Sequence, residues 1–147
     1  MLNNYHDDYA EIAPGHINEP HMPVLIAGDI SLSMVGLPIQ NLNKSINRFA
    51  SDVCKDPKAA DLVDVAVLGF NDKPHVEQNW RPITEMNPVD FAAGGGTNLS
   101  AALEKGVEML RERSHLYEEV GIEVKMPYLI LITDASGGDV TEIAKVI

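Results

Sequence analysis

Two short, continuous apolar runs stand out in the hydrophobic pattern of the chain, Val24 to Gly28 and Tyr128 to Thr133 (YLILIT). Each has the length and apolar character of a strand that is buried on both faces of a parallel sheet. Two further runs, Leu62 to Phe70 (LVDVAVLGF) and His75 to Ile83, flank a turn-like Asn-Asp-Lys-Pro segment and predict a hairpin. Because Pro82 cannot donate a hydrogen bond to a ladder, the second hairpin strand is expected at a sheet edge.

Apolar residues at helical spacing lie between these strands. The first set ends at Asp56-Pro57, and the second follows a loop of residues 87–96 that ends in three glycines. The two sets are Leu42, Ile46, Phe49 and Val53, and then Leu99, Leu103, Gly106 and Leu110. The alternation of strands with amphipathic helices predicts an α/β sheet with right-handed crossovers.

The N-terminal segment, residues 1–21, is polar and acidic and shows no helical or strand period. We expect it to form an arm before one domain of residues 22–147, since the chain length of 147 residues suits a single domain. His6, His16 and His21 lie among acids in this segment, and we expect them to be solvent-exposed side chains rather than metal ligands.

Composition excludes several classes of partner. A net charge of −11 opposes approach to phosphate backbones and anionic lipids, so neither nucleic acid nor a membrane is expected as a partner. The chain start lacks a basic-flanked apolar leader, and no run approaches the ~18 apolar residues of a membrane span, which predicts a cytoplasmic location. The single cysteine, Cys54, can form neither an internal disulfide nor a cysteine zinc cluster, and we expect it to be a buried small apolar residue.

Oxygen-bearing side chains follow the two apolar runs, where the carboxyl ends of parallel strands form the usual functional crevice. Asp29 follows the first run and Asp134 follows the last, so the two carboxylates converge if these strands are neighbours. Ser31 and Ser33 lie beside Asp29, and the loop Gly94-Gly-Gly-Thr97 opens the next helix at the same rim.

Such a set of oxygens suits Mg²⁺, which takes six oxygen ligands in near-octahedral geometry and usually keeps some waters. The predicted metal ligands are Asp29, Ser31, Ser33, Thr97 and Asp134. Two carboxylates balance a divalent charge, whereas three hydroxyls add no negative charge, so the ion still attracts an Asp or Glu of a partner protein. Taken singly, Asp29 or Ser31 could cap a turn, Thr97 could be a helix N-cap, and the glycines could allow a tight bend. Their joint occurrence on one rim favours the metal site.

These residues resemble those of von Willebrand factor A (vWA) domains, whose metal-ion-dependent adhesion site (MIDAS) has the pattern Asp-x-Ser-x-Ser, a later Thr and a later Asp. GDISLSM, GGGTNLSAAL and LILITD match the three parts, within about residues 22–138. The likeness is greatest to bacterial cytoplasmic domains of the tellurium-resistance TerY type. The resemblance implies a Rossmann-like fold with a mostly parallel sheet, one antiparallel edge strand and helices on both faces. It also implies Mg²⁺, Mn²⁺ or Ca²⁺ with the hydroxyls of Ser31, Ser33 and Thr97 as ligands. Asp29 and Asp134 would bind the ion directly or through water.

The sequence departs from the vWA pattern in three places. Leu32 stands between the serines where a small residue is usual, and Ala135 follows the last aspartate in place of glycine. The chain also ends before the last two strands of the vWA order 3-2-1-4-5-6. YLILIT would then be an edge strand, which predicts pairing between subunits, cover by the N-terminal arm, or a shortened gene product.

Three functions remain open at this point. The first is a metal-dependent protein-interaction module without catalysis, in a bacterial stress or tellurite-resistance-like system. The second is a phosphohydrolase with Asp29 as nucleophile, although Ser31 occupies the place of the usual second acid and no basic residue adjoins GDISLSM. The third is a metal-independent structural or oligomerisation domain. Nucleotide binding by GGGT is weak, because the sequence has neither GxGxxG after the first strand nor a GxxxxGK[ST] loop.

Overall fold

A four-stranded sheet forms the centre of the computed structural model, which describes residues 19–133. Its strands are β1 (Met22–Asp29), β2 (Val63–Phe70), β3 (Pro74–Pro82) and β4 (Tyr128–Ile132), in the spatial order β3-β2-β1-β4. β1 pairs in parallel with both β2 and β4, and β2 pairs antiparallel with β3. The predicted mixed sheet is confirmed, with the strand that contains Pro82 at one edge.

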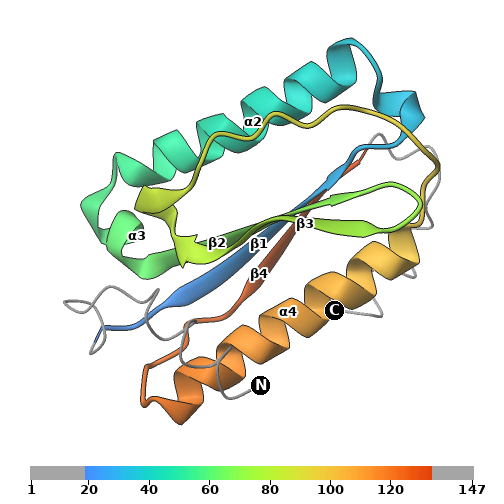
Figure 1. The fold of residues 1–147 in the computed structure, drawn as a ribbon. Coiled ribbons are helices and arrows are strands. Elements are labelled where there is room, and N and C mark those ends of the chain that lie inside the picture. Colours follow the sequence, from blue (N-terminus) through green and yellow to red (C-terminus); the bar gives the residue numbers. More distant parts are fainter. Residues whose placement is uncertain (1–18, 134–147) are drawn as a thin grey trace.

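Helices cover both faces of this sheet (Figure 1). The helices α2 (Leu37–Cys54) and α3 (Pro57–Leu62) lie on one face, and α4 (Leu99–Glu119) lies on the other. Short 3₁₀ turns, η2 (Leu32–Met34) and η3 (Ile83–Glu85), follow β1 and β3. This arrangement is the predicted α/β architecture.

The core has two layers because successive side chains of a strand point to opposite faces. Val24 and Ile26 of β1 belong to the layer that contains Leu42 and Ile46 of α2. Leu25 and Ala27 belong to the layer under α4, with Ala102, Met109 and Leu110. Burial on both faces explains why β1 and β2 are continuously apolar in sequence.

Two helix boundaries differ from the prediction because proline begins helices as well as ending them. Asp56-Pro57 ends α2 but also begins α3, where the Asp56 carboxylate accepts a hydrogen bond from the Lys58 backbone N–H at 3.0 Å. Pro38 lies in the first turn of α2, so this helix begins before the apolar period that predicted it.

Three expectations about burial are wrong. His21 is buried, with 2% of its surface exposed, because its ring nitrogen is hydrogen-bonded to the buried Asp64 carboxylate. Cys54 is exposed at the last position of α2. YLILIT is only partly buried: Tyr128 is exposed, and residues 129–132 pack against both core layers but stay half-buried, since β4 is the outer strand of the described sheet. His6 and His16 lie outside the described residues.

No helix within residues 19–133 is both long and apolar enough to cross a membrane.

Candidate metal centre

Asp29 ends β1 at the carboxyl edge of the sheet, and its side chain is 0% exposed. Its Oδ1 accepts a hydrogen bond from the Ser31 backbone N–H at 2.9 Å. The hydroxyl of Thr133, which directly follows β4, donates to Oδ2 at 2.7 Å. The parallel pairing of β1 with β4 brings these two strand ends together, so the condition under which the sequence analysis expected them to converge is met. Asp134 itself lies outside the described residues, and Thr133 is a site residue that the sequence analysis missed.

The two serines of the predicted set come together in the turn after β1. The Oγ atoms of Ser31 and Ser33 are 3.0 Å apart. Ser31 is buried, with 2% exposure, whereas Ser33 is exposed. The intervening Leu32 is 62% exposed, so its bulky side chain faces solvent and does not separate the hydroxyls. The departure from a small residue at this position therefore does not keep the two hydroxyls apart.

The glycine loop before α4 is joined to the same turn by backbone hydrogen bonds. Gly94 N–H donates to the Ile30 carbonyl at 2.8 Å, and Leu32 N–H donates to the Gly95 carbonyl at 2.9 Å. Thr97 lies exposed at the end of this loop. The N-cap of α4 is Asn98, whose side chain accepts from Ala101 N–H at 3.1 Å. The capping interpretation of Thr97 is therefore wrong, and its hydroxyl has no part in starting the helix.

The turn after β2 holds the glycine loop in place. The Asp72 carboxylate accepts from Gly96 N–H at 3.1 Å, and the Asn71 amide donates to the Gly94 carbonyl at 3.0 Å. Gly95 has a φ of +79°, and a Cβ there would lie 2.7 Å from an Asp72 oxygen. Only glycine combines this left-handed backbone with so close an approach.

Two asparagines of α2 hold the segment that connects β3 to this loop. The side-chain amide of Asn43 donates to the Phe91 carbonyl and accepts from its N–H, and Asn47 pairs in the same way with Val89, at 2.7–3.0 Å. Four residues along a helix rise about 6 Å, close to the ~6.6 Å of two residues in an extended chain. The matched spacing lets α2 pair with residues 89–91 as a neighbouring strand would. The sequence analysis missed this role, although two asparagines four residues apart on one helix could have indicated it.

The chemistry of the site fits a hard divalent cation. Asp29 is a buried carboxylate whose hydrogen-bond partners are both neutral donors, and none of the ion pairs among residues 19–133 involves it. Buried charges in proteins are normally paired or coordinate metals. Carboxylate and hydroxyl oxygens are the ligands that Mg²⁺ or Mn²⁺ prefers, and each carboxylate oxygen keeps a lone pair beyond its hydrogen bond. Within the described part of the chain, no three His, Cys, Asp or Glu side chains form a metal site, so a cation bound beside Asp29 would need hydroxyl ligands as well.

A second buried polar cluster lies at the opposite end of the sheet. Asp64, near the start of β2, is paired with the His21 ring at 2.8 Å and accepts a hydrogen bond from the Tyr117 hydroxyl. Arg113 donates its Nε–H to that hydroxyl at 3.0 Å, and its guanidinium lies over the Trp80 and Tyr117 rings. Asp64 is thus paired within the cluster, whereas Nη1 and Nη2 of Arg113 are buried without a hydrogen-bond partner among the described residues. We assign the cluster to the packing of α4 against the sheet.

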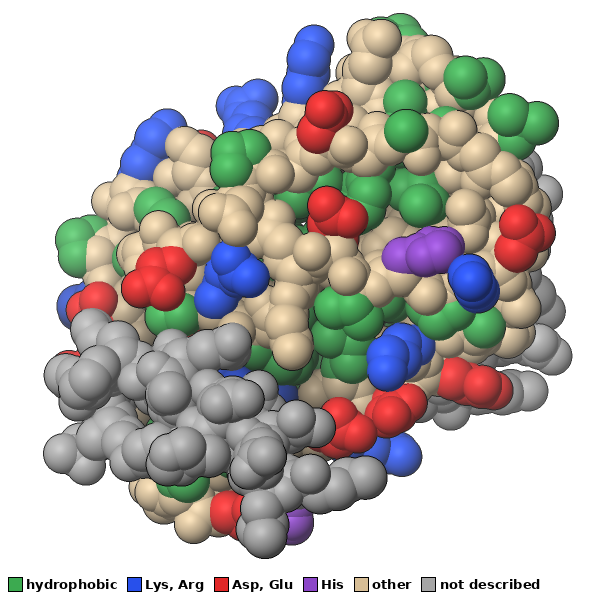
Figure 2. Space-filling view, viewed as in Figure 1, with side chains coloured by type: hydrophobic (Ala, Val, Ile, Leu, Met, Phe, Trp, Pro, Cys, Tyr) green, Lys and Arg blue, Asp and Glu red, His purple; other side chains and the backbone are tan. Residues whose placement is uncertain are grey.

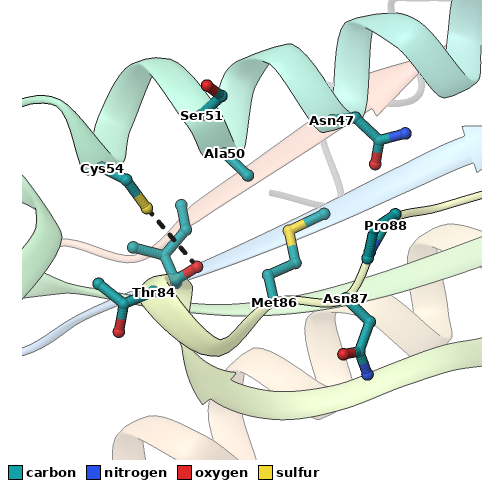
Figure 3. Close-up of a pocket in the computed structure, with 9 residues that line it drawn as sticks. Asn47, Ala50, Ser51, Cys54, Thr84, Met86, Asn87 and Pro88 are labelled. Atoms are coloured by element: carbon teal, nitrogen blue, oxygen red, sulfur yellow. Dashed lines mark hydrogen bonds between the residues drawn. The ribbon is translucent and has the colours of Figure 1, made fainter.

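A groove of about 290 Å³ lies between the C-terminal half of α2 and the segment after β3 (Figure 3). Its lining residues are Asn47, Ala50, Ser51, Cys54, Ile83, Thr84, Met86, Asn87 and Pro88. The Cys54 thiol points toward the Ile83 carbonyl at 3.8 Å. None of the lining residues carries a formal charge, and the groove is at the far end of α2 from Asp29, so it plays no part in the candidate site.

Known structures share this fold. PilB minor pilin (D319A mutant) from Streptococcus sanguinis superposes with a TM-score of 0.60 and 16% identity, over 77% of this chain and 29% of that one. The vWF domain of the type V pili tip protein Mfa5 from Porphyromonas gingivalis superposes with a TM-score of 0.51 and 18% identity, over 62% of this chain and 33% of that one. The fold of the described residues is therefore that of a vWA-like domain.

Sequence similarity points to larger proteins. Inter-alpha-trypsin inhibitor heavy chain H1 is 24% identical in Bos taurus and 25% identical in Sus scrofa over 153 aligned positions. The alignment covers 97% of this chain and 15% of those curated relatives, so the chain spans about a seventh of their length. No family model matches the chain.

Proposed function

We propose that this vWA-like domain is a divalent-metal-dependent protein-interaction module. The observation that carries the proposal is the buried Asp29 carboxylate, which has neutral hydrogen-bond donors but no ion-pair partner among the described residues. A bound Mg²⁺ or Mn²⁺ would supply the missing positive charge. Ser31 and Ser33 would hold the ion on the turn, and Thr97 would reach it from the glycine loop. Asp134 completes the proposed ligand set.

The partner would contribute an Asp or Glu side chain. Asp29 and Asp134 would be the only charged ligands, and together they would balance the charge of a divalent ion. Because the hydroxyl ligands are neutral, the site would have no excess negative charge and could still attract a third carboxylate. The role of the chain is to position the oxygens: the hydrogen bonds from Ser31 N–H and Thr133 fix the Asp29 carboxylate, and the loop contacts to Ile30 and Leu32 fix the position of Thr97.

A non-enzymatic role is part of the proposal. A phosphohydrolase with Asp29 as nucleophile would commonly need a second acid two residues on and a basic residue near the phosphate, whereas Ser31 occupies that position and no Lys or Arg occurs between Asp29 and Lys44. The likeness of GDISLSM and GGGTNLSAAL to TerY-type domains supports a cytoplasmic setting in a bacterial stress or tellurite-resistance-like system.

Metal binding is tested by titrating Mn²⁺ into the full chain and following free ion by electron paramagnetic resonance. Wild type is expected to bind, and Asp29→Asn to bind at least tenfold more weakly, because the amide carries no charge. Metal at about 100 times the wild-type Kd is also expected to stabilise wild type by roughly 2.7 kcal/mol and Asp29→Asn by no more than about 1.4 kcal/mol. Without metal, Asn at this position relieves an unpaired buried charge, so the variant is expected to be at least as stable as wild type.

A matched serine pair provides the control. Ser33→Ala removes an exposed hydroxyl of the site and is expected to weaken Mn²⁺ binding, whereas Ser45→Ala removes an exposed hydroxyl from the middle of α2 and should have no effect. Acetate added to the Mn²⁺ complex is expected to lower solvent proton relaxivity as it displaces a metal-bound water. Equal Mn²⁺ affinity in wild type and Asp29→Asn would favour the metal-independent structural domain instead.

A further inference from the structure

The turn that carries Ser31 and Ser33 also exposes three large apolar side chains. Leu32, Val35 and Leu37 are 62%, 63% and 66% exposed, and we name them the apolar rim. Within residues 19–133, six large hydrophobic side chains are exposed, so half of them lie in this short segment. Figure 2 shows hydrophobic side chains gathered over η2 and the start of α2, the corner of the molecule where β1 ends in Figure 1.

The core does not need these side chains. Met34 and Ile39, their neighbours in sequence, are 4% and 8% exposed and belong to the core layer under α2. The segment thus buries the side chains that pack inward and still presents Leu32, Val35 and Leu37 to water. Exposed apolar groups that gather at one place mark an interaction surface, whereas scattered ones need no explanation.

The local charge suits an acidic ligand. The chain as a whole has a net charge of −11, which repels acidic partners. No charged residue occurs between Asp29 and Lys44, so the apolar rim is a neutral area in an acidic molecule. Each rim residue lies within four positions of Ser33, which limits their separation to about 14 Å. A short peptide segment can therefore reach the serines and the apolar rim together.

We infer that the partner segment carries an Asp or Glu directly beside a large apolar residue, and that the apolar rim selects it. This inference rests on the proposed metal site: the ion takes the carboxylate, and Leu32, Val35 and Leu37 bury the apolar neighbour. The ion gives the attraction for any acid, and the apolar rim gives the preference among acidic segments.

A random peptide library displayed on phage tests the inference. It is selected against the full chain in Mg²⁺, and bound phage are released with EDTA. Peptides recovered on wild type are expected to combine an acid with an adjacent Leu, Ile, Phe, Met or Trp. Binding of a recovered peptide, measured by fluorescence anisotropy, is expected to weaken about tenfold or more in Leu32→Ser/Val35→Ser/Leu37→Ser, because apolar area is no longer buried. The Mn²⁺ affinity of this variant should equal that of wild type.

Two variants separate the apolar rim from general effects. Leu32→Gly removes only the side chain between the serines and is expected to give part of the loss. Val76→Ser changes a 45% exposed apolar residue on β3 and should bind the peptides as wild type does. Recovered peptides with an acid but no apolar neighbour, or equal binding to the triple variant, would overturn the inference while leaving the metal site intact.

Two other outcomes also count against the inference. If wild type binds Mn²⁺ but no peptide is released by EDTA, the apolar rim does not select peptides. If wild type self-associates without peptide and the triple variant does not, the occupant of the apolar rim is a second copy of the chain. Failure of wild type to bind Mn²⁺ would instead remove the proposed function on which the inference rests.

Discussion

Asp29 and Asp64 are both buried, yet the residues around them differ in charge. Asp64 is paired with His21, and Arg113 reaches it through the Tyr117 hydroxyl. Asp29 has hydrogen bonds from Ser31 and Thr133 but no cationic side chain in the described part of the chain. The Asp64 charge therefore has a histidine partner and a nearby guanidinium within the fold, whereas the surroundings of Asp29 are suited to receive a cation. At the scale of single residues, this contrast separates a carboxylate of the packing between α4 and the sheet from the carboxylate proposed to bind metal.

The pH dependence of stability tests the structural cluster. Burial raises the pKa of Tyr117 well above its ordinary value of 10.0, with the Arg113 charge acting in the opposite direction. The folded chain therefore keeps the Tyr117 proton above pH 10 while the unfolded chain loses it. The contribution of Tyr117 to the free energy of unfolding is complete below pH 10. Above that pH the contribution falls by about 1.4 kcal/mol per pH unit.

Removing the Tyr117 hydroxyl should remove this fall of stability above pH 10. Tyr117→Phe is expected to be about 1–3 kcal/mol less stable than wild type near pH 8, because Asp64 loses a buried donor. The difference should narrow as the pH rises above 10. Urea unfolding followed by circular dichroism, from pH 8 to pH 11, measures the free energy of unfolding of wild type and of Tyr117→Phe at each pH. A difference that stays constant across this range would contradict the account.

At the scale of elements, the site is assembled by contacts between segments far apart in sequence. The turn after β1, the turn after β2 and the loop before α4 are joined by the hydrogen bonds of Ile30, Leu32 and Asn71. Asn43 and Asn47 of α2 bring the connecting chain to that point. Because these bonds are mostly to backbone atoms, the geometry of the loop is held independently of its side chains.

Two glycines of this loop form a matched pair for mutation. Gly95→Ala places a methyl group against Asp72 and forces a φ of +79° on a residue with a Cβ, so the loop is expected to shift. Mn²⁺ affinity should fall about tenfold, and stability by about 1–3 kcal/mol. Gly94→Ala meets nothing within 4 Å and is expected to bind Mn²⁺ as wild type does. Equal affinity in the two variants would mean that the loop contributes nothing to the metal site.

At the scale of the whole molecule, β4 is an edge strand of the described sheet. It pairs with β1 on one side only, and its residues are exposed or half-buried. An apolar edge strand is a template for pairing with another strand. We therefore expect the 147-residue chain to associate with a second copy through Tyr128 to Thr133.

Light scattering over a concentration series measures this association. Tyr128→Lys places a charge on the edge and is expected to shift the chain toward monomer. Met126→Lys adds the same charge at a 76% exposed position just before the strand and should leave the mass unchanged. A wild-type chain that stays monomeric at every concentration would remove the expectation.

Much of this architecture could be predicted from local pattern. The apolar runs, the helical periods and Pro82 predict the strands, the helices and the edge position of β3, because burial on two faces, on one face or at an edge each leaves a different period. The proximity of Asp29, Ser31 and Ser33 could also be predicted, since the three share one turn. The short α3 and the role of Asn98 could not, because Asp-Pro and Thr-Asn sequences are compatible with more than one cap.

The sequence by itself determined the α/β class and which oxygen-bearing residues stand at strand ends. Only the tertiary structure decided that Thr133 donates to Asp29, that Leu32 faces solvent, and that His21 is buried against Asp64. The α/β class and the residues at strand ends depend on the spacing of apolar residues and on neighbours along the chain, which are local properties. The features that only the tertiary structure decided depend on which strands lie side by side and on which charges meet in the interior, and these are settled only when segments distant in sequence pack together.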